Sequence, residues 1–280
     1  DKPDLVIVAG DVNSTIACTL VAKKLQIPVA HLEAGLRSYD ERMPEEINRV
    51  LTDRISDILL TPSLEANENL IKEGINPEKI HFVGNIMIDS LISHQKKAEL
   101  SDIFDKLTIS QNESYALVTL HRPSNVDEYD GLKMLLTSLI EIGKLIKIIF
   151  PMHPRTKKNI QDFGLSDYVN FSKNLIITEP LGYFDFLKLE MNAKLILTDS
   201  GGVQEESTYF SVPCLTLREN TERPITISEG TNQLVELNVT SIVNNSLEII
   251  EGKVKKGKIP KYWDGKTAKR IVKMINNIYK

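Results

Sequence analysis

Leu195-Ile196-Leu197-Thr198-Asp199-Ser200-Gly201-Gly202-Val203-Gln204-Glu205-Glu206 is the stretch that decides the fold. A short apolar run leads directly into Asp, Ser and two glycines, which open a helical pattern. Ser200 and the glycines let an anion approach the backbone N–H groups where the helix begins. Glu206 follows about one and a half turns later and can accept hydrogen bonds from ribose hydroxyls. The stretch predicts a strand, a turn and a helix that bind a nucleotide phosphate; a plain helix start with glycines for close packing is the alternative.

The same alternation extends along the chain on both sides of this stretch. The apolar runs that we interpret as buried strands are Leu5–Ala9, Val29–Leu32, Ile58–Thr61, Ile80–Val83, Tyr115–Leu120, Ile146–Phe150, Leu175–Ile177, Leu195–Leu197 and Val212–Leu217. Helical patterns between them include Ser14–Leu25, Glu45–Ser56, Ser63–Glu73 and Gly131–Lys144. Strands that alternate with helices predict βαβ units, and therefore an α/β fold with parallel sheets.

A polar segment without strong periodicity divides the series in two. We place a linker near Glu99–Ser114, between a first Rossmann-like domain of residues 1–110 and a second one of residues 111–263. A length of 280 residues allows two such domains. The end of the chain predicts an amphipathic helix, and we expect residues 264–280 to pack back on the first domain. Because the chain enters a strand at Leu5 without an initiator Met, we expect the first domain to be truncated at its N-terminus.

The composition excludes several classes of protein. The chain is 41% hydrophobic and 26% charged, as globular proteins are. It has 34 Lys and Arg residues and 38 Asp and Glu residues, so it lacks the excess of positive charge that is typical of proteins that bind nucleic acid or a membrane surface. No apolar run approaches the ~20 residues that span a bilayer. Cys18 and Cys214 are expected to be buried free thiols, which indicates a cytoplasmic protein.

Carboxylates follow the predicted strands of the first domain. Asp11 comes after the first strand, Glu33 after the second, and Glu45 opens the following helix. Each has a structural alternative, because Asp11 or one of its polar neighbours can cap a helix, Glu33 can pair with Arg37, and Glu45 suits the positive end of a helix dipole. Three carboxylates at one edge of a sheet can also keep one member protonated at neutral pH, as acid–base chemistry requires.

Cationic side chains follow the predicted strands of the second domain. His121 and Arg122 come directly after Tyr115–Leu120, and His153 follows the next strand. An imidazolium can donate a hydrogen bond to a phosphate, and Arg223, in a polar loop, can bind one bidentately. Solvated histidines and a solvated loop are the alternatives. No metal-ligand spacing is visible, so neither a metal nor another cofactor is expected.

Together these motifs resemble the non-hydrolysing UDP-N-acetylglucosamine 2-epimerases, whose two Rossmann-like domains are similar to those of GT-B glycosyltransferases. The matching stretches come in the family's order and span nearly the whole chain: Gly10-Asp11, His31–Arg37, Pro44–Arg49, Val83–Asn85, His121-Arg122, Thr198–Glu206, Thr221–Pro224 and Gly230-Thr231. The resemblance implies two parallel sheets that face a cleft, a UDP-sugar substrate, and a homodimer. It also implies that the chain lacks the family's N-terminal strand and its Gly-Thr-Arg-Pro loop.

The resemblance further implies roles for single residues. The residues that it places in catalysis, as proton-transfer carboxylates and a histidine at the leaving diphosphate, are Asp11, Glu33, Glu45 and His121. Those that it places against UDP, with Phe186 on the uracil, are Phe186, Ser200, Gly201, Gly202, Glu206 and Arg223. Those that it places near the substrate or an allosteric nucleotide-sugar are Arg49, Arg122 and His153.

The reaction implied is inversion at C2, which interconverts UDP-N-acetylglucosamine and UDP-N-acetylmannosamine through loss and re-addition of UDP, with a 2-acetamidoglucal between them. Such products are precursors of cell-surface polysaccharides. Four alternatives stay open: a hydrolysing relative, an epimerase of a related UDP-deoxy or diacetamido sugar, a non-catalytic nucleotide-sugar binder, and a GT-B glycosyltransferase. The three carboxylates favour proton chemistry over glycosyl transfer.

Overall fold

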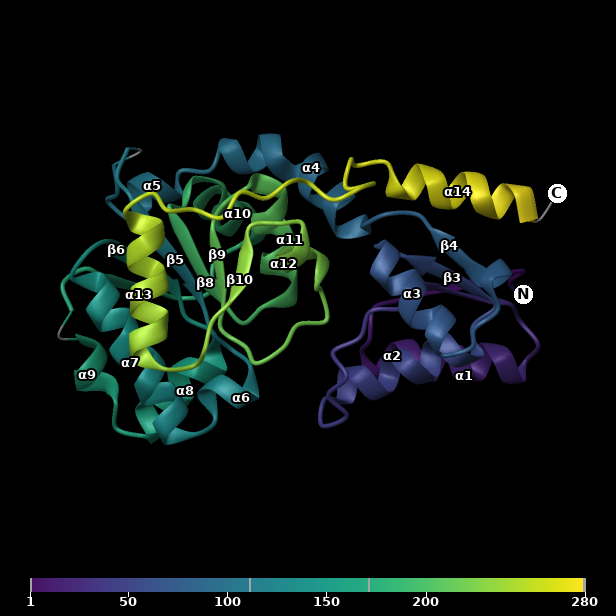
Figure 1. The fold of residues 1–280 in the computed structure, drawn as a ribbon, viewed down its shortest axis with the longest axis horizontal. Helices are drawn as coiled ribbons and strands as arrows, with labels where there is room; N and C mark the ends of the chain where they lie inside the picture. The colour runs from purple at the N-terminus through teal and green to yellow at the C-terminus, as the bar shows by residue number, and fades with distance from the viewer. Residues whose placement is uncertain (1, 111, 171, 279–280) are drawn as a thin grey trace. The chain divides into compact units, whose positions relative to one another are not determined.

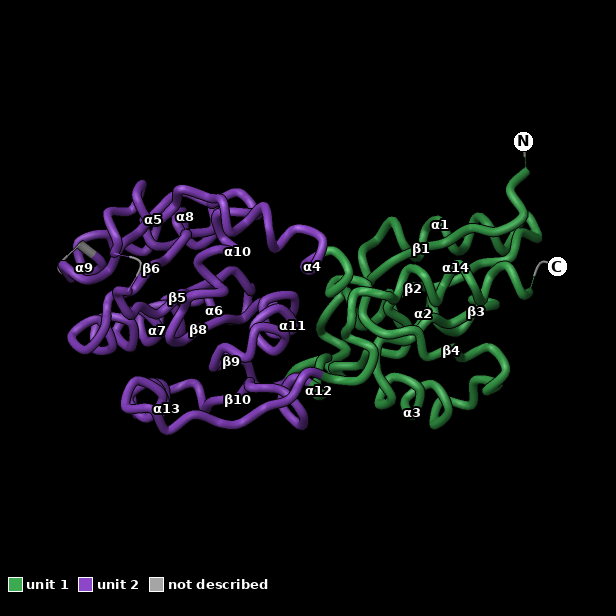
Figure 2. The backbone as a smooth tube through the Cα atoms, turned by 90° about the horizontal axis from the view of Figure 1, so that it is seen from above, with its two compact units in different colours: residues 1–90, 221–225, 260–280 green, residues 91–220, 226–259 purple. Residues whose placement is uncertain are grey.

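The computed structural model describes residues 2–110, 112–170 and 172–278. The chain forms two compact units (Figure 2): unit 1 comprises residues 1–90, 221–225 and 260–280, and unit 2 comprises residues 91–220 and 226–259. Each unit contains one parallel sheet flanked by helices (Figure 1), so the predicted α/β class is confirmed. The domain boundaries inferred from the sequence stay a prediction. Residue 111 of the expected linker and residues 279–280 of the expected C-terminal helix lie outside the described residues.

Unit 1 is built on a four-stranded sheet in the order β1-β2-β3-β4. Its strands are β1 (Val6–Ala9), β2 (Val29–Leu32), β3 (Ile58–Thr61) and β4 (Ile80–Phe82), all parallel. Its helices are α1 (Asn13–Lys24), α2 (Pro44–Ile55), α3 (Leu64–Lys72), a 3-10 turn (Pro77–Lys79) and α14 (Thr267–Ile278). Strand β3 is buried along its whole length, because helices cover both faces of a parallel sheet.

The two faces of this sheet pack against different helices. Leu60 joins a core cluster with Ile271 of α14, while the adjacent Leu59 joins a second cluster with Leu70 of α3. Met274 and Ile275 of α14 extend the first cluster, whereas Ile278 stays largely exposed. Successive strand residues therefore serve opposite cores, as their alternating direction requires.

Cys18 corrects one expectation from the sequence. Cys214 is buried as expected, but Cys18 is exposed and lines an apolar hollow beside β1. Among the described strands, β1 has a partner on one side only, so the face of α1 beside it is left uncovered.

Unit 2 is built on a six-stranded parallel sheet in the order β10-β9-β8-β5-β6-β7. Its strands are β5 (Tyr115–Thr119), β6 (Lys147–Pro151), β7 (Leu175–Thr178), β8 (Leu195–Thr198), β9 (Cys214–Thr216) and β10 (Asn232–Leu234). Its helices are α5 (Ile103–Lys106), α6 (Pro123–Val126), α7 (Tyr129–Gly143), α8 (Pro154–Asp162), α9 (Ser166–Asn170), α10 (Tyr183–Asn192), α11 (Gly201–Phe210) and α13 (Val239–Ile250). Two further helices, α4 (Ile86–Glu99) and α12 (Ile225–Ser228), begin in the segments of unit 1 and end in those of unit 2.

The strand order locates the place where a ligand is expected. Counted from β5 as the first strand, the order is 3-2-1-4-5-6, the doubly wound arrangement of dinucleotide-binding folds. The direction in which the chain adds strands reverses between β5 and β8. Open parallel sheets bind ligands beyond the carboxyl ends of the two strands at such a reversal. His121 follows one of these strands and Ser200 follows the other.

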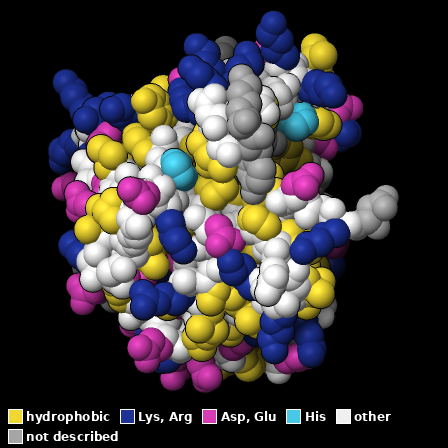
Figure 3. Space-filling view, turned by 90° about the vertical axis from the view of Figure 1, so that its right-hand side faces the viewer, with side chains coloured by type: hydrophobic (Ala, Val, Ile, Leu, Met, Phe, Trp, Pro, Cys, Tyr) yellow, Lys and Arg dark blue, Asp and Glu magenta, His cyan; other side chains and the backbone are white. Residues whose placement is uncertain are grey.

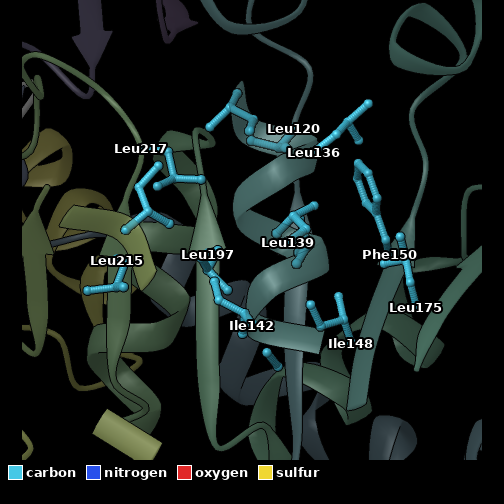
Figure 4. Close-up of a cluster of buried hydrophobic side chains, with 14 of the residues drawn as sticks. Leu120, Leu136, Leu139, Ile142, Ile148, Phe150, Leu175, Leu197, Leu215 and Leu217 are labelled. Atoms are coloured by element: carbon cyan, nitrogen blue, oxygen red, sulfur yellow. The ribbon is translucent and has the colours of Figure 1, made fainter. Parts of the chain in front are cut away.

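Two apolar cores lie on opposite faces of this sheet. The larger one includes Leu197 and Phe150 of the strands with Leu139 of α7 (Figure 4), while the neighbouring Ile196 belongs to the other core. This other core also contains Phe104 of α5, together with Ile103 and Ile109. Within the segment expected to be a linker, these three apolar side chains are thus packed against the sheet.

Within the described ranges, no helix is long and apolar enough to cross a bilayer. On the face of the molecule seen in Figure 3, Lys and Arg side chains are mixed with Asp and Glu rather than gathered by sign. This mixing agrees with the nearly balanced charge of the sequence, 34 basic against 38 acidic residues.

Candidate active site

Asp199 organises the carboxyl ends of β5 and β8 in unit 2. Its carboxylate accepts hydrogen bonds from the backbone N–H groups of His121 (3.0 Å) and Arg122 (2.9 Å) and from the side chain of Asn125 (3.1 Å). The hydroxyl groups of Thr119 and Thr198, 2.5 Å apart, tie the same two strand ends together. The turn that carries His121 is therefore fixed to the turn that precedes α11.

The same carboxylate also orients the His121 ring. His121 Nδ1 lies 3.0 Å from Asp199 Oδ1, and Asp199 is fully buried. Burial acts to raise the pKa of Asp199, but the hydrogen bonds from His121 and the nearby backbone outweigh it, so the pKa is lowered. The contact with Asp199 is made through Nδ1, so Nε2 is on the side of the ring that points away from this carboxylate. Sequence reasoning quoted Asp199 but gave it no role.

His153 has a different hydrogen-bonding role. Its Nδ1 accepts a hydrogen bond from the backbone N–H of Arg155 (3.1 Å) at the start of α8, so it caps this helix. The two histidine rings lie 5.6 Å apart. The two neighbouring rings therefore use Nδ1 differently: that of His153 accepts a hydrogen bond from a backbone N–H, whereas that of His121 faces a carboxylate.

The start of α11 has the geometry of an anion site. Ser200 occupies the N-cap position, as in a plain helix start, but its hydroxyl makes no capping hydrogen bond. Its backbone N–H donates to Thr198 Oγ1 at 2.9 Å. A Cβ added at Gly202 would have no neighbouring atom within 4 Å, so the space before the first turn is open. Backbone N–H groups at a helix start favour a phosphate there.

Glu206 and Phe186 lie on adjacent helices of unit 2. Glu206, on α11, is 6% exposed and accepts a hydrogen bond from the Tyr183 hydroxyl at 3.0 Å. Burial raises the pKa of Glu206, although the hydrogen bonds that it accepts act to lower it. Phe186, on α10, is partly buried against the apolar core. Tyr183 was missed in the sequence; its place three residues before Phe186 on the same helix was the available signal.

Asp11 is bound to Arg49 in unit 1. Arg49 Nη2 donates to Asp11 Oδ2 at 2.6 Å. The helix α1 does not use Asp11 as a cap, because its N-cap is Val12 and no side chain caps it. The expectation that one of the polar residues after β1 caps this helix is therefore wrong. Thr15 instead donates its hydroxyl to the carbonyl of Ala9 at 2.8 Å.

The two adjacent glutamates of α2 have different surroundings. Glu46 is buried, pairs with Arg49, and accepts hydrogen bonds from the backbone N–H groups of Ser38 (2.9 Å) and Tyr39 (3.0 Å). Glu46 therefore anchors the loop before the helix. Glu45 is partly exposed, and no hydrogen bond or ion pair of its carboxylate is seen in the described part of the chain. Of the two glutamates, Glu46 therefore has a structural role, and the carboxylate of Glu45 is the better candidate for contact with a substrate.

Glu33 lies in a strained backbone conformation at the end of β2. Its φ is +70°, a left-handed value that residues with a Cβ rarely adopt. Burial raises the pKa of Glu33, the charge of Arg223 acts to lower it, and Asp11 acts to raise it. Pairing with Arg37, the structural alternative, is wrong, because Arg37 is bound to Asp53 (2.8 Å) and Glu73 (2.7 Å).

A buried histidine lies beneath these carboxylates. His31 is fully buried, with Nδ1 2.6 Å from Asp53 Oδ1 and Nε2 2.9 Å from the carbonyl oxygen of Gly10. Asp53 is also bound to Arg37 and to the backbone N–H of Gly35 (3.0 Å), so it is an acceptor. Both ring nitrogens of His31 therefore lie against oxygen atoms, one of Asp53 and one of Gly10. Its charge acts to lower the pKa of Glu33. The sequence gave His31 no separate role.

The predicted site residues thus fall into two groups, each within one unit. Those in unit 1 are Asp11, Glu33, Glu45, Arg49 and Arg223. Those in unit 2 are His121, Arg122, His153, Phe186, Ser200, Gly201, Gly202 and Glu206. Arg223, which the sequence places in the second domain, belongs to unit 1, where it pairs with Glu222 at 2.5 Å.

Comparison with known proteins settles the family. A sequence profile described as UDP-N-acetylglucosamine 2-epimerase matches residues 1–276. The chain belongs to the UDP-N-acetylglucosamine 2-epimerase family. The resemblance seen in the motifs is therefore confirmed, and the family is one of isomerases.

Relatives of this epimerase-family chain are found in archaea and bacteria. The UDP-N-acetylglucosamine 2-epimerase of Methanocaldococcus jannaschii is 47% identical over 281 residues, which cover 98% of this chain and 76% of that protein. The UDP-2,3-diacetamido-2,3-dideoxy-D-glucuronate 2-epimerase of Pseudomonas aeruginosa is 38% identical over 278 residues, 98% of this chain and 75% of that protein. Sequence similarity alone therefore reaches epimerases of two different UDP-sugars.

Solved structures of the family have the same fold. The M. jannaschii enzyme in complex with UDP-GlcNAc and UDP matches with a TM-score of 0.90, covering 99% of this chain and 76% of that one. The Neisseria meningitidis enzyme bound to UDP-GlcNAc matches with a TM-score of 0.89 at 33% identity, covering 99% and 77%. The GT-B-like architecture expected from the sequence is thereby confirmed.

Proposed function

We propose that this protein interconverts UDP-N-acetylglucosamine and UDP-N-acetylmannosamine by elimination and re-addition of UDP. The observation that carries the proposal is the carboxylate group of unit 1: Glu33 has a raised pKa and lies near Asp11, which is bound to a guanidinium. A carboxyl group with a raised pKa beside a carboxylate bound to a guanidinium is an arrangement that suits acid–base catalysis. The names of the relatives support the same reaction.

In the proposed mechanism a carboxylate of unit 1 takes the proton from C2 of the sugar. The electron pair of that C–H bond forms the C1–C2 double bond, and the C1–O bond breaks so that UDP leaves with its electron pair. A carboxylic acid then delivers a proton to C2 on the opposite face while UDP adds back at C1. Asp11, Glu33 and Glu45 are the candidates for these two roles, because inversion needs groups on two faces.

Unit 2 is proposed to hold the nucleotide. The open start of α11, at Ser200, Gly201 and Gly202, suits the diphosphate. As an imidazolium, His121, fixed by Asp199 through Nδ1, can donate from Nε2 to the oxygen that carries charge when UDP leaves. Glu206 is proposed to accept hydrogen bonds from the ribose hydroxyls, and the ring of Phe186 to lie against the uracil. Arg122 and His153 flank this region. The role of Arg223, which belongs to unit 1, as a phosphate ligand stays a prediction from the resemblance.

The deciding experiment is solvent exchange at C2. The protein is incubated with UDP-N-acetylglucosamine in D2O, and the sugar is followed by NMR. The expected result is deuterium at C2 together with the manno epimer, still linked to UDP. Free amino sugar with released UDP would identify a hydrolysing enzyme instead. Recovery of undeuterated substrate alone, with UDP binding demonstrated by calorimetry, would identify a non-catalytic nucleotide-sugar binder.

A second sugar specificity is favoured by one observation. A relative at 38% identity is named an epimerase of a diacetamido UDP-glucuronate. The same C2 chemistry applies to that sugar, since only the substituents at C3 and C5 differ. A panel that contains both UDP-sugars, assayed by the same deuterium exchange, separates the two specificities through their kcat/KM ratio. We further propose that the protein is a cytoplasmic homodimer. Size-exclusion chromatography with light scattering tests whether it forms a dimer.

A further inference from the structure

A buried acid next to the proposed ribose site is not used by this mechanism. Glu190, on α10, is fully buried, and no donor among the described residues reaches either of its side-chain oxygens. An ionised carboxylate in such a place has lost its hydration without gaining a hydrogen bond. Glu190 is therefore either an unpaired carboxylate that destabilises the fold or a protonated carboxyl group that donates its hydrogen to a neighbour.

The neighbours of Glu190 decide between these readings. Helix α10 packs against α11, and Glu206 of α11 is the charged group that acts most strongly on Glu190. Tyr183 precedes Glu190 by seven residues, two helical turns, so both project from one face of α10. Tyr183 donates to Glu206 Oε1 at 3.0 Å. Glu206 therefore lies along a helix face that offers a phenol at one point and a carboxyl group two turns later.

None of the groups that act on Glu190 supplies a positive charge. Burial and then the charge of Glu206 raise its pKa well above the ordinary value. From β9, Cys214 faces the same region, and burial raises the pKa of that thiol to about 12, so it is neutral. Tyr183 is likewise a neutral phenol, because burial raises its pKa. Two ionised carboxylates would repel each other here, whereas a single proton between them makes the contact attractive.

We propose that Glu190 is a positioning residue: it stays a neutral carboxylic acid and donates its hydrogen to Glu206. Glu206 thereby remains ionised and keeps its free lone pairs directed at a vicinal diol, the ribose of the nucleotide. The idea rests on the proposed role of Glu206 in nucleotide binding. Glu190 itself touches no ligand, and an apolar side chain of its size would fill the space without supplying the donor.

Two substitutions separate donation from packing. Glu190→Gln keeps the shape and a neutral donor, while Glu190→Met keeps the approximate volume and removes the donor. UDP binding by calorimetry is expected to be within about twofold of wild type for Gln and about tenfold weaker for Met at neutral pH. Without the donor, the pKa of Glu206 rises, so the Met variant is expected to lose most affinity at low pH and to recover as the pH rises.

An infrared measurement tests the proton without any nucleotide. At neutral pH, the spectrum of the wild type minus that of Glu190→Gln is expected to show the C=O band of a protonated carboxyl group. Loss of a carboxylate band instead would overturn the proposal, as would equal weakening by Gln and Met, or wild-type affinity and pH dependence in Met. If the wild type itself does not bind UDP, the proposed function fails, while the infrared band still reports on the Glu190 proton.

Discussion

Arg49 donates to Asp11 across 2.6 Å, so the carboxylate that follows the first strand is bound to a guanidinium and not to a helix end. The same arginine pairs with Glu46, which anchors the loop before α2. Arg49 therefore joins a candidate catalytic carboxylate to a structural one. A fixed carboxylate is what proton transfer needs, since a small displacement of a catalytic group costs much of its effect.

Arg49→Lys is expected to lower the rate of C2 exchange by about ten- to a hundredfold, because an ammonium cannot bind Asp11 and Glu46 at once as the guanidinium fork does. Deuterium incorporation followed by NMR measures the rate. Arg42→Lys is the matched control, since Arg42 pairs with Asp40 while 80% exposed. Equal rates in the two variants would show that the Asp11–Arg49 pair does not serve catalysis.

Asp11→Asn, Glu33→Gln and Glu45→Gln are each expected to lower turnover by about 10²- to 10⁴-fold while leaving UDP affinity within about twofold. The reason is that the amides keep the shape of the side chains but cannot exchange protons with C2. Turnover is followed by NMR and UDP binding by calorimetry. Glu41→Gln, at an exposed position before the same helix, serves as the control. Full activity in all three amide variants would mean that the carboxylates are structural.

Glu33→Gln is expected to change how stability depends on pH. The pKa of Glu33 is raised in the folded state above its ordinary 4.5, so the folded protein holds this proton more tightly than the unfolded chain does. The resulting stabilisation is complete below the ordinary value and is lost as pH rises through the raised pKa. The Gln variant should therefore gain stability relative to wild type as pH increases.

The single tryptophan offers a local signal for that measurement. Trp263 is 2% exposed and belongs to unit 1, as Glu33 does. Thermal unfolding followed by tryptophan fluorescence across a series of pH values gives the difference between variant and wild type. Glu41→Gln should give a difference that is flat with pH. A flat difference for Glu33→Gln as well would contradict the raised pKa.

Asp199→Asn is expected to reduce both stability and turnover. Asp199 is a buried acceptor of several N–H donors, and removing its charge leaves the His121 ring without its partner. The expected loss is about 3–5 kcal/mol in the free energy of unfolding, measured with urea. Asp127→Asn breaks the exposed pair with Arg155 and should cost less than about 1 kcal/mol. A similar small loss for both variants would argue against an organising role for Asp199.

The two cysteines should react differently with a thiol reagent. Cys18 is exposed, whereas Cys214 is fully buried and burial raises its pKa to about 12. One equivalent of label per folded chain is expected, and two after unfolding in guanidinium. Peptide mapping by mass spectrometry identifies the labelled residue. Labelling of Cys214 in the folded protein would show that β9 opens readily.

Most of the fold could be predicted because its strands are continuous apolar runs. Ile58–Thr61 is confirmed to the residue as β3, since burial on both faces leaves no polar position inside it. Strand β10 was missed because Asn232-Gln233-Leu234 is short and mostly polar, with Asn232 buried by hydrogen bonds rather than by apolar packing. Helix α5 was missed because Ile103 and Phe104 stand in a polar segment too short to show a period.

The site was harder to predict than the fold, because its contacts join distant parts of the chain. The motifs located Glu33 and Asp11 through their place after strands, but Arg37 was assigned to Glu33, four residues before it. In the structure Arg37 reaches Asp53 on α2, sixteen residues away, and Glu73 at the end of α3. Local spacing cannot specify such partners. The contacts of His31 with Asp53 and with the carbonyl of Gly10 belong to the same network, and local spacing did not indicate them either.

The left-handed backbone of Glu33 implies that selection for robustness and selection for turnover oppose each other at this position. A glycine there would relieve strain of about 1–2 kcal/mol and lose about 0.5–1 kcal/mol in chain entropy, so the folded protein would be slightly more stable. It would also remove the carboxyl group. Under mutagenesis and heat challenge without a requirement for activity, position 33 should drift towards glycine; under a requirement for product, glutamate should persist.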